Sequence, residues 1–252
     1  MTDPTDEISS GAYRFNYDQI AAQYAAKVDS APYNALYERP AMLALLPDLT
    51  GLRILDAGCG SGWYAARLLE RGAILDAVDA SGAMVDHARA KLEESGLLQA
   101  GRANLRVTDL ADPLPFENGV FDGVVSPLVL HYMKDWRPAL RQMHRVLKPR
   151  GWIQISTHHP AADAERFQTR NYFATEHIVD EWDWVGKVEF YRRSLTEIVA
   201  SVVESGFVID KLVEPVPTDE FRAEKPDSWE RLMNQPEFLI VVAHKSESSF
   251  DE

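Results

Sequence analysis

Three glycines alternate with small residues directly after an acid in the segment 56–62, which reads Asp-Ala-Gly-Cys-Gly-Ser-Gly. Glycine tolerates positive φ and lets a ligand approach the backbone, so Gly58, Gly60 and Gly62 suit a ligand-binding turn. A helix that begins after the turn offers unpaired N–H groups and partial positive charge. Asp56 would repel a phosphate and suits a ligand with positive charge. A turn with only a structural role is the alternative.

The glycine spacing also bears on the kind of nucleotide that could bind. A dinucleotide-binding turn follows the pattern G-x-G-x-x-G, whose last glycine lets the helix approach the strand closely. In this chain the third glycine comes one residue early, and the bulky Trp63 stands in the next position. The pattern therefore disfavours a nicotinamide oxidoreductase.

Further polar residues end the following expected strands. Asp79 closes the segment 73–79 about 20 residues after Gly58, where a βαβ unit brings its second strand beside the first. A carboxylate there can accept hydrogen bonds from both ribose hydroxyls. The alternative role, capping the next helix, suits Ser81 better. The residues expected at the carboxyl ends of strands are Asp56, Asp79, Asp109 and Ser126.

Hydrophobic periodicity places these residues on alternating strands and helices. Strands are expected at 53–57, 73–79, 104–110, 120–126 and 152–157, with helices at 63–71, 81–92 and 136–147 between them. A helix at 194–205 and strands at 207–214 and 236–244 complete the pattern, and prolines mark a loop between the last two strands. The alternation predicts an α/β, doubly wound parallel sheet with its ligand crevice at the carboxyl edge.

Two segments depart from the alternation, and we expect both to cover the site. Residues 13–47 carry two helical patterns that form either an N-terminal lid or a simple cap on the sheet. Residues 158–193 form a long aromatic-rich insertion that is expected to cover the substrate. A second sheet edge or an oligomer contact is the alternative for this insertion. The length suits a single domain over 1–252.

The composition argues against several classes of function. The chain has 26 Lys and Arg against 39 Asp and Glu, so its net charge of −13 disfavours generic binding to nucleic acid or anionic membranes. Its single cysteine, Cys59, excludes an intrachain disulfide and a cysteine-cluster metal site, and we expect no metal site. No apolar run approaches 18 residues and no leader is evident, which predicts a soluble, cytoplasmic protein.

The segment 56–62 resembles motif I of the class I S-adenosylmethionine-dependent methyltransferases. Other matching pieces are 79–84 (Asp-Ala-Ser-Gly-Ala-Met), Asp109, 121–126 and the turn 146–152 (Val-Leu-Lys-Pro-Arg-Gly-Trp). The likeness covers about 17–245 and is similar to the small-molecule group that includes quinone-biosynthesis methyltransferases. It implies a Rossmann-like seven-stranded sheet with one antiparallel strand, helices on both faces, and S-adenosyl-L-methionine as cofactor.

The resemblance also implies roles for individual residues. Gly58 and Gly60 would approach the methionine part of the donor, and Asp79 would hold the ribose. Met84 would pack on adenine, while Asp109 and the backbone N–H of Leu110 would bind its polar edge. Asp56 would stabilise the donor's ammonium or order the turn, and Ser126 would border the methionine part. The full expected cofactor set is Tyr24, Asp56, Gly58, Gly60, Gly62, Asp79, Ala80, Met84, Asp109, Leu110 and Ser126.

Methyl transfer from a sulfonium is an in-line displacement that needs alignment, exclusion of water and, for some acceptors, a base. Histidine is the natural base at neutral pH, and His159 is the first candidate because it follows the fifth strand. His131 and Arg192 are further catalytic candidates, beside His158 and Tyr132; a structural role is the alternative for each histidine. The expected acceptor is a small molecule. A tRNA or protein methyltransferase with an activator subunit and a non-catalytic donor-binding scaffold are the alternatives.

The third strand is expected at an edge of the sheet, where its outer backbone groups have no strand partner. Leu105 and Val107 should share the face that packs on the core, and only Arg106 guards the edge with charge. Such an edge can accept a strand from another chain. The resemblance permits a small zinc-binding activator there, and the chain's own loop 111–119 covering the edge is the alternative.

Overall fold

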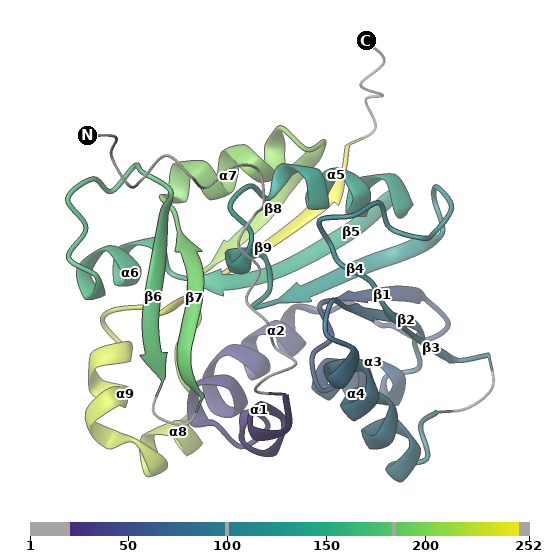
Figure 1. Cartoon of the computed structure of the whole chain (residues 1–252), viewed down its shortest axis with the longest axis horizontal. Coiled ribbons are helices and arrows are strands. Elements are labelled where there is room, and N and C mark those ends of the chain that lie inside the picture. Colours follow the sequence, from purple (N-terminus) through teal and green to yellow (C-terminus); the bar gives the residue numbers. More distant parts are fainter. Residues whose placement is uncertain (1–20, 99–100, 183–184, 247–252) are drawn as a thin grey trace, which may run out of the picture.

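The structure, a computed structural model, describes residues 21–98, 101–182 and 185–246 (Figure 1). Seven strands form one sheet in the order β3-β2-β1-β4-β5-β9-β8. They are β1 (Arg53–Ala57), β2 (Ile74–Asp79), β3 (Ala103–Val107), β4 (Phe121–Pro127), β5 (Leu147–His158), β8 (Phe207–Val213) and β9 (Phe238–Lys245). Only β9 runs antiparallel to its neighbours, which confirms the predicted α/β sheet with one antiparallel strand.

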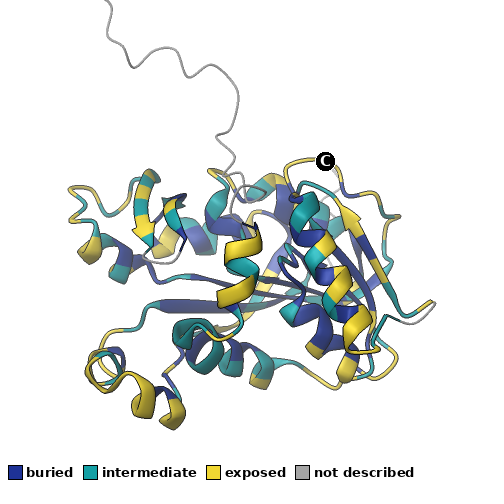
Figure 2. Cartoon of the chain, turned by 60° about the horizontal axis from the view of Figure 1, so that its bottom comes forward, coloured by how far each residue is buried: buried dark blue, intermediate teal, exposed yellow. Residues whose placement is uncertain are grey.

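Helices cover both faces of this sheet, as predicted (Figure 1). On one face lie α2 (Arg39–Leu45), α3 (Trp63–Glu70) and α4 (Gly82–Glu94), and on the other α5 (Arg137–Val146) and α7 (Leu195–Val203). Both faces are apolar, because successive side chains of a buried strand point to opposite sides. On β1, Ile54 packs with α3 and α4, while the next residue, Leu55, packs with α5 and α7. The central strands are dark blue, and thus buried, in Figure 2. None of the helices in the described ranges is long and apolar enough to cross a membrane.

The N-terminal helices lie beside the carboxyl edge of the sheet. The helix α1 (Ala21–Val28) packs on α4, where Lys91 Nζ lies 2.5 Å from Asp29 Oδ2. A π-helical turn, η2 (Asn34–Glu38), then runs directly into α2. Residues 13–20, the first part of the expected lid, lie outside the described residues.

The insertion at 158–193 folds into a short helix and a hairpin. The helix is α6 (Pro160–Arg166), and β6 (Glu176–Trp182) and β7 (Gly186–Arg192) form a separate antiparallel two-stranded sheet. Val188 and Phe190 of β7 pack in a cluster with Tyr24 of α1 and Tyr132 of the 3-10 turn η3 (Leu130–Tyr132). The hairpin therefore contacts both the N-terminal helix and the turn after β4.

Several expected boundaries differ from the structure; the third strand, for example, ends at Val107 rather than 110. The strand β5 begins at Leu147 rather than 152, because an irregularity in its pairing with β4 accommodates the turn in which Arg150 has φ 60°. The expected loop between the last two strands contains α8 (Asp219–Glu224) and α9 (Pro226–Leu232). Pro226 begins a helix, since proline fits the first helical turn, where its missing N–H costs nothing.

The third strand confirms one part of the expectation for its faces and contradicts another. It lies at the sheet edge, and Leu105 is buried in the core as expected. Val107, however, is 60% exposed although it shares that face. It lies beside Gly82 at the start of α4, where glycine offers no side chain to cover it. On the opposite face, Arg106 stacks over Phe116 of the loop 111–119, so this loop covers only part of the edge.

Candidate active site

The glycine turn connects β1 to α3 at the carboxyl edge of the sheet. Gly58, Gly60 and Gly62 have φ values of 91°, 50° and 85°, a left-handed region that other residues rarely adopt. The backbone N–H groups of Gly58 and Cys59 donate to the carbonyl of Val78 on the neighbouring strand. The turn is thereby fixed to β2 as well as to β1.

The carboxylate of Asp79 ties this turn to the next one. Its Oδ2 accepts from the Gly60 N–H at 2.8 Å, and its Oδ1 accepts from the Ser81 N–H at 2.9 Å. The side chain of Ser81 caps α4 by accepting from the Met84 N–H, as the sequence predicted. The N–H groups of Gly60 and Ser81 hold the Asp79 carboxylate at the end of β2, where it lines the crevice. The helix α4 does not need Asp79 as its cap, because Ser81 has that role.

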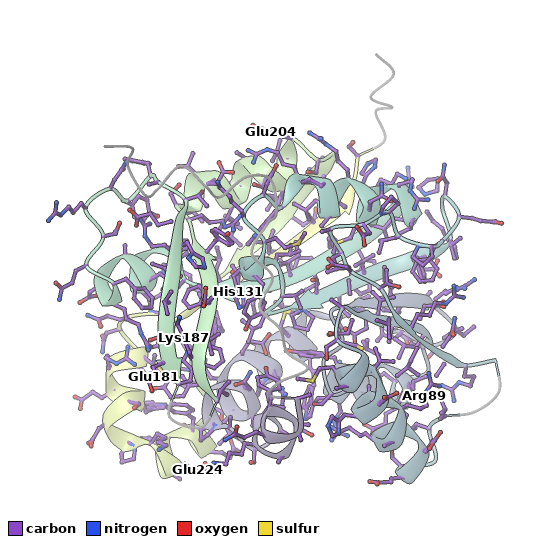
Figure 3. All side chains as sticks on the ribbon, in the orientation of Figure 1. Arg89, His131, Glu181, Lys187, Glu204 and Glu224 are labelled. Atoms are coloured by element: carbon purple, nitrogen blue, oxygen red, sulfur yellow. The ribbon has the colours of Figure 1, made fainter. Side chains whose placement is uncertain are left out.

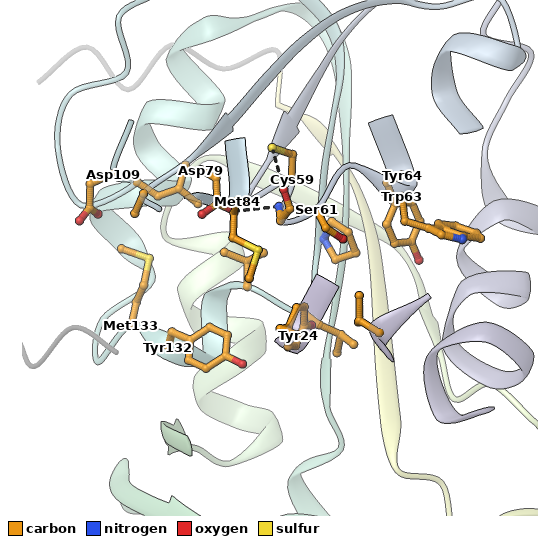
Figure 4. A pocket seen from close by; sticks show the side chains of 18 of the residues that line it. Tyr24, Cys59, Ser61, Trp63, Tyr64, Asp79, Met84, Asp109, Tyr132 and Met133 are labelled. Atoms are coloured by element: carbon orange, nitrogen blue, oxygen red, sulfur yellow. Dashed lines mark hydrogen bonds between the residues drawn. The ribbon is translucent and has the colours of Figure 1, made fainter. Parts of the chain in front are cut away.

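A cavity of about 660 Å³ opens above these two turns (Figure 4). Figure 4 shows Asp79, Met84 and Asp109 toward one end, with Trp63 and Tyr64 toward the other. Eight of the eleven predicted cofactor residues line it: Tyr24, Gly58, Gly60, Asp79, Ala80, Met84, Asp109 and Leu110. Burial raises the pKa of Tyr24 to about 12, so its phenol stays protonated at neutral pH.

The other three predicted residues lie beneath the cavity lining. Asp56 is fully buried, and neither carboxyl oxygen has a hydrogen-bond partner among the described residues. Desolvation, with a smaller contribution from the negative charge of Asp79, raises its pKa to about 8. Ser126 donates to the Ala57 carbonyl at 2.9 Å. A side chain at Gly62 would lie 2.8 Å from Ala88, so this glycine permits α3 to pack on α4.

Known proteins share this sequence pattern and this architecture. Residues 55–155 match the model of a methyltransferase domain family. A crystal structure of an S-adenosylmethionine-dependent methyltransferase from Mesorhizobium loti is 28% identical, with a TM-score of 0.69, over 86% of this chain and all of that one. These findings support a class I S-adenosylmethionine-dependent methyltransferase. They imply S-adenosylmethionine as its cofactor.

Two curated relatives and a second solved structure extend the comparison of this methyltransferase. The malonyl-[acyl-carrier protein] O-methyltransferase of Erwinia pyrifoliae is 32% identical over 56% of this chain and 52% of its own length. The ubiquinone biosynthesis O-methyltransferase of Xanthomonas oryzae is 33% identical over 44% of each. The chain thus spans about half the length of these relatives. The methyltransferase bound to the Haloferax volcanii activator Trm112 shares the fold, at 22% identity and a TM-score of 0.67, over 93% of this chain and 99% of that one.

The cavity of the methyltransferase fits a donor that carries positive charge. Its described lining residues include four carboxyls, on Glu38, Asp79, Asp109 and Asp135, against two basic side chains, on Arg39 and Lys134. The carboxyl of Asp56 beneath the same turn adds little negative charge, because its pKa of about 8 keeps it mostly protonated at neutral pH. S-adenosylmethionine has a sulfonium and an ammonium against one carboxylate, so its net charge complements this set.

The three predicted catalytic residues do not appear among the described lining residues. His159 caps α6 through an Nδ1 that accepts from the Ala161 N–H, and its Nε2 lies 2.9 Å from Glu214. Arg192 is buried and binds Glu176 and the backbone of Asn171. Their catalytic roles stay predictions.

His131, which is labelled in Figure 3, is buried and directly precedes the lining residue Tyr132 in the sequence. Its ring stacks on His158 with centroids 4.3 Å apart, and both its nitrogens lack partners among the described residues. Burial holds its pKa well below the usual range, so the ring is neutral at physiological pH. Its expected catalytic role also stays a prediction.

Several lining residues were not anticipated from the sequence. They come from the π-helical turn and α2 (Asn34, Glu38, Arg39), from α3 (Trp63, Tyr64) and from the segment after β4 (Leu128, Val129, Met133). Glu38 and Arg39 stand in a helix with apolar neighbours, where a charged pair could have signalled a buried polar site. The segment after β4 is mainly apolar in sequence, and apolar residues carry no signature of ligand contact.

Proposed function

We propose that the donor lies along the glycine turn with its adenosine part between Asp79, Met84 and Asp109. In support, these three side chains gather at one end of the cavity (Figure 4). The Asp79 carboxylate is held at the end of β2 by the N–H groups of Gly60 and Ser81, and a carboxylate is an acceptor of the kind that ribose hydroxyls need. Gly60 supports the placement as well, since a Cβ there would meet nothing within 4 Å.

We further propose that the acceptor is a small organic molecule methylated on oxygen. The observation that supports it is the apolar part of the cavity wall, formed by Val28, Leu128, Val129, Met133 and Pro138. Apolar walls with a few polar groups are typical of small-molecule sites. The Erwinia and Xanthomonas relatives are both named O-methyltransferases, which favours an oxygen nucleophile.

In this mechanism the donor, when bound, supplies a methyl group that is already activated for displacement. The protein contributes alignment of the acceptor oxygen and exclusion of water. Residues 13–47 act as the lid in this proposal, since Tyr24 and Val28 of α1 line the cavity. The insertion 158–193 acts as the substrate cover: Thr175 lines the cavity, and the hairpin packs on Tyr24 and Tyr132.

The test combines donor binding with a search for product. The purified protein is incubated with methyl-labelled S-adenosylmethionine and, separately, with each of the two fractions of a cell extract that a small-pore filter divides: the small molecules that pass and the macromolecules that are retained. The proposal expects labelled product in a small-molecule fraction, and loss of that product in Asp79→Ala. Donor binding without any labelled product in any fraction would favour the non-catalytic scaffold. Label that appears only in macromolecular fractions would reject the small-molecule acceptor.

A second candidate is a tRNA or protein methyltransferase that works with a small zinc-binding activator. The observation that favours it is the open edge of the main sheet, where β3 pairs only with β2 and Val107 is 60% exposed. A fold shared with the methyltransferase of the Haloferax complex is compatible with such a partner. The acidic charge of the chain makes an unaided tRNA substrate the less favoured form of this candidate.

A further inference from the structure

A buried carboxyl outside the predicted set lines the active-site cavity. Glu38 is 1% exposed and ends the π-helical turn Asn34–Glu38. Its Oε2 accepts from the Tyr64 hydroxyl at 2.8 Å, and its Oε1 accepts from the Ser156 hydroxyl at 2.5 Å. Single π-helical turns inside α-helices occur often at functional sites, because they redirect a side chain that the regular helix would place elsewhere.

The charge of Glu38 has no ion-pair partner within the described ranges. The neighbouring Arg39 is directed elsewhere, since its guanidinium stacks on Trp63 at 4.3 Å and bonds to the carbonyl of Asp29. Burial raises the pKa of Glu38, against the opposing effects of its two hydroxyl donors and of the Arg39 charge nearby. A buried carboxylate whose two hydrogen-bond partners are both neutral is costly, and a cationic ligand would offset that cost.

The position of Glu38 identifies which part of the donor it would meet. Its partner Tyr64 lies at the end of the cavity opposite to Asp79 and Asp109, and the glycine turn lies between (Figure 4). If adenosine occupies the end at Asp109, the amino-acid part of the donor extends toward Tyr64. The ammonium is the group of that part that carries N–H donors and positive charge, which is what a carboxylate binds most strongly.

We propose that Glu38 binds the ammonium of the donor and that Tyr64 and Ser156 hold its carboxylate in position. This assignment rests on the proposed donor site. It makes the π-helical turn part of the donor-binding machinery, so the N-terminal helices contribute recognition as well as cover. A purely structural Glu38 would instead serve only to join α2 to α3 and β5.

The test compares two probes that differ in the amino-acid part. S-adenosylhomocysteine contains the ammonium, whereas 5′-methylthioadenosine contains the same nucleoside without it. Calorimetry on Glu38→Gln, which keeps the size of the side chain and one acceptor oxygen but removes its charge, should show about tenfold or greater loss of affinity for S-adenosylhomocysteine. Affinity for methylthioadenosine should stay within about twofold of wild type.

Two further variants make the outcome decisive. Asp79→Asn, at the nucleoside end, should weaken both probes alike. Tyr64→Phe should give a smaller loss that is again selective for S-adenosylhomocysteine, and it tests the idea if Glu38→Gln fails to fold. Equal losses for both probes, or no loss in either variant, would overturn the assignment of Glu38. Failure of the wild type to bind either probe would instead reject the donor site itself.

Discussion

At the scale of single residues, Asp79 joins the glycine turn to the proposed ribose site through its hydrogen bonds to Gly60 and Ser81. Asp79→Ala should therefore weaken S-adenosylhomocysteine binding by about 1.5–3 kcal/mol, because charge-assisted hydrogen bonds are lost. Calorimetry measures this directly. Asp86→Ala, which removes an exposed acid from α4, serves as the control and should leave the affinity unchanged. An unchanged affinity in Asp79→Ala would contradict the ribose assignment.

Asp56 should make the stability of the donor-free protein depend on pH. Its pKa is raised from 3.8 to about 8, so between these values the folded state retains a proton that the unfolded chain has lost. The free energy of unfolding must then fall as pH rises through this window, by up to ~1.4 kcal/mol per pH unit. The loss is complete above about pH 8 and absent below about pH 4.

The variant Asp56→Asn removes the titrating group without removing any hydrogen bond within the described residues. The free energy of unfolding of this variant minus that of wild type should therefore be about 2–4 kcal/mol larger at pH 8 than at pH 5. Urea unfolding at the two pH values measures the difference, with Asp86→Asn as the exposed control. Parallel pH profiles of Asp56→Asn and wild type would show that Asp56 ionises normally.

The sequence predicts acids at the ends of strands but gives no spacing signal that Glu38 lines the cavity. A glycine turn and the acid ending the next strand have a spacing that topology fixes, so the neighbourhood of Gly60 and Asp79 follows from the βαβ pattern. Glu38 reaches the cavity only through a π-helical turn and contacts far along the chain, at Tyr64 and Ser156. His159 shows the converse, since a histidine just after a strand also suits a helix cap.

At the scale of elements, the buried guanidinium of Arg192 fastens the loop that precedes the hairpin. It contacts Glu176 and Thr169 and donates to the carbonyls of Asn171 and Tyr172. Arg192→Met should cost about 2–4 kcal/mol of stability and speed amide exchange in 168–176. Arg166→Met is the matched control on the same insertion, because the Arg166–Asp180 pair is exposed at the arginine and should contribute under about 1 kcal/mol. Equal effects of the two variants would contradict this role of Arg192.

The lid and the insertion should respond together to the donor. The helix α1 of the expected lid shares an apolar cluster with β7 through Tyr24, and Tyr24 also lines the cavity. Binding of S-adenosylhomocysteine should therefore slow amide exchange in residues 13–47 and 158–193, while the α5 core changes little. Hydrogen exchange with and without the ligand is the measurement. Equal protection in both states would leave these segments as simple caps on the sheet.

At the scale of the whole molecule, the sheet order was predictable because strands and helices alternate from β1 to β3 and again from β4 to β5. The hairpin of β6 and β7 was not predictable, since β6 alternates intermediate and exposed residues and the buried residues of β7 include the charged Glu189 and Arg192. The helices α8 and α9 were hidden by prolines that begin a helix as readily as they end one. Regular elements thus followed from local pattern, whereas the elements that cover the site depended on tertiary contacts.

The two edges of the seven-stranded sheet allow a controlled test for a partner. Val107 at the β3 edge and Val208 on the opposite edge strand β8 are both exposed, at 60% and 47%. If an activator adds to β3, Val107→Lys should abolish its binding, because a lysine on an edge strand opposes pairing with another chain. Val208→Lys should bind the activator as wild type does.

Size-exclusion chromatography with light scattering, on protein purified from its native host, measures the mass of the complex, and metal analysis measures zinc per complex. The activator candidate expects a stoichiometric, zinc-containing companion on wild type and Val208→Lys that is missing from Val107→Lys. Val107 is the residue substituted because it is 60% exposed, whereas Arg106 stacks over Phe116 of the loop 111–119. A zinc-free monomer that methylates a small molecule at full rate would reject the activator and leave the single-chain enzyme.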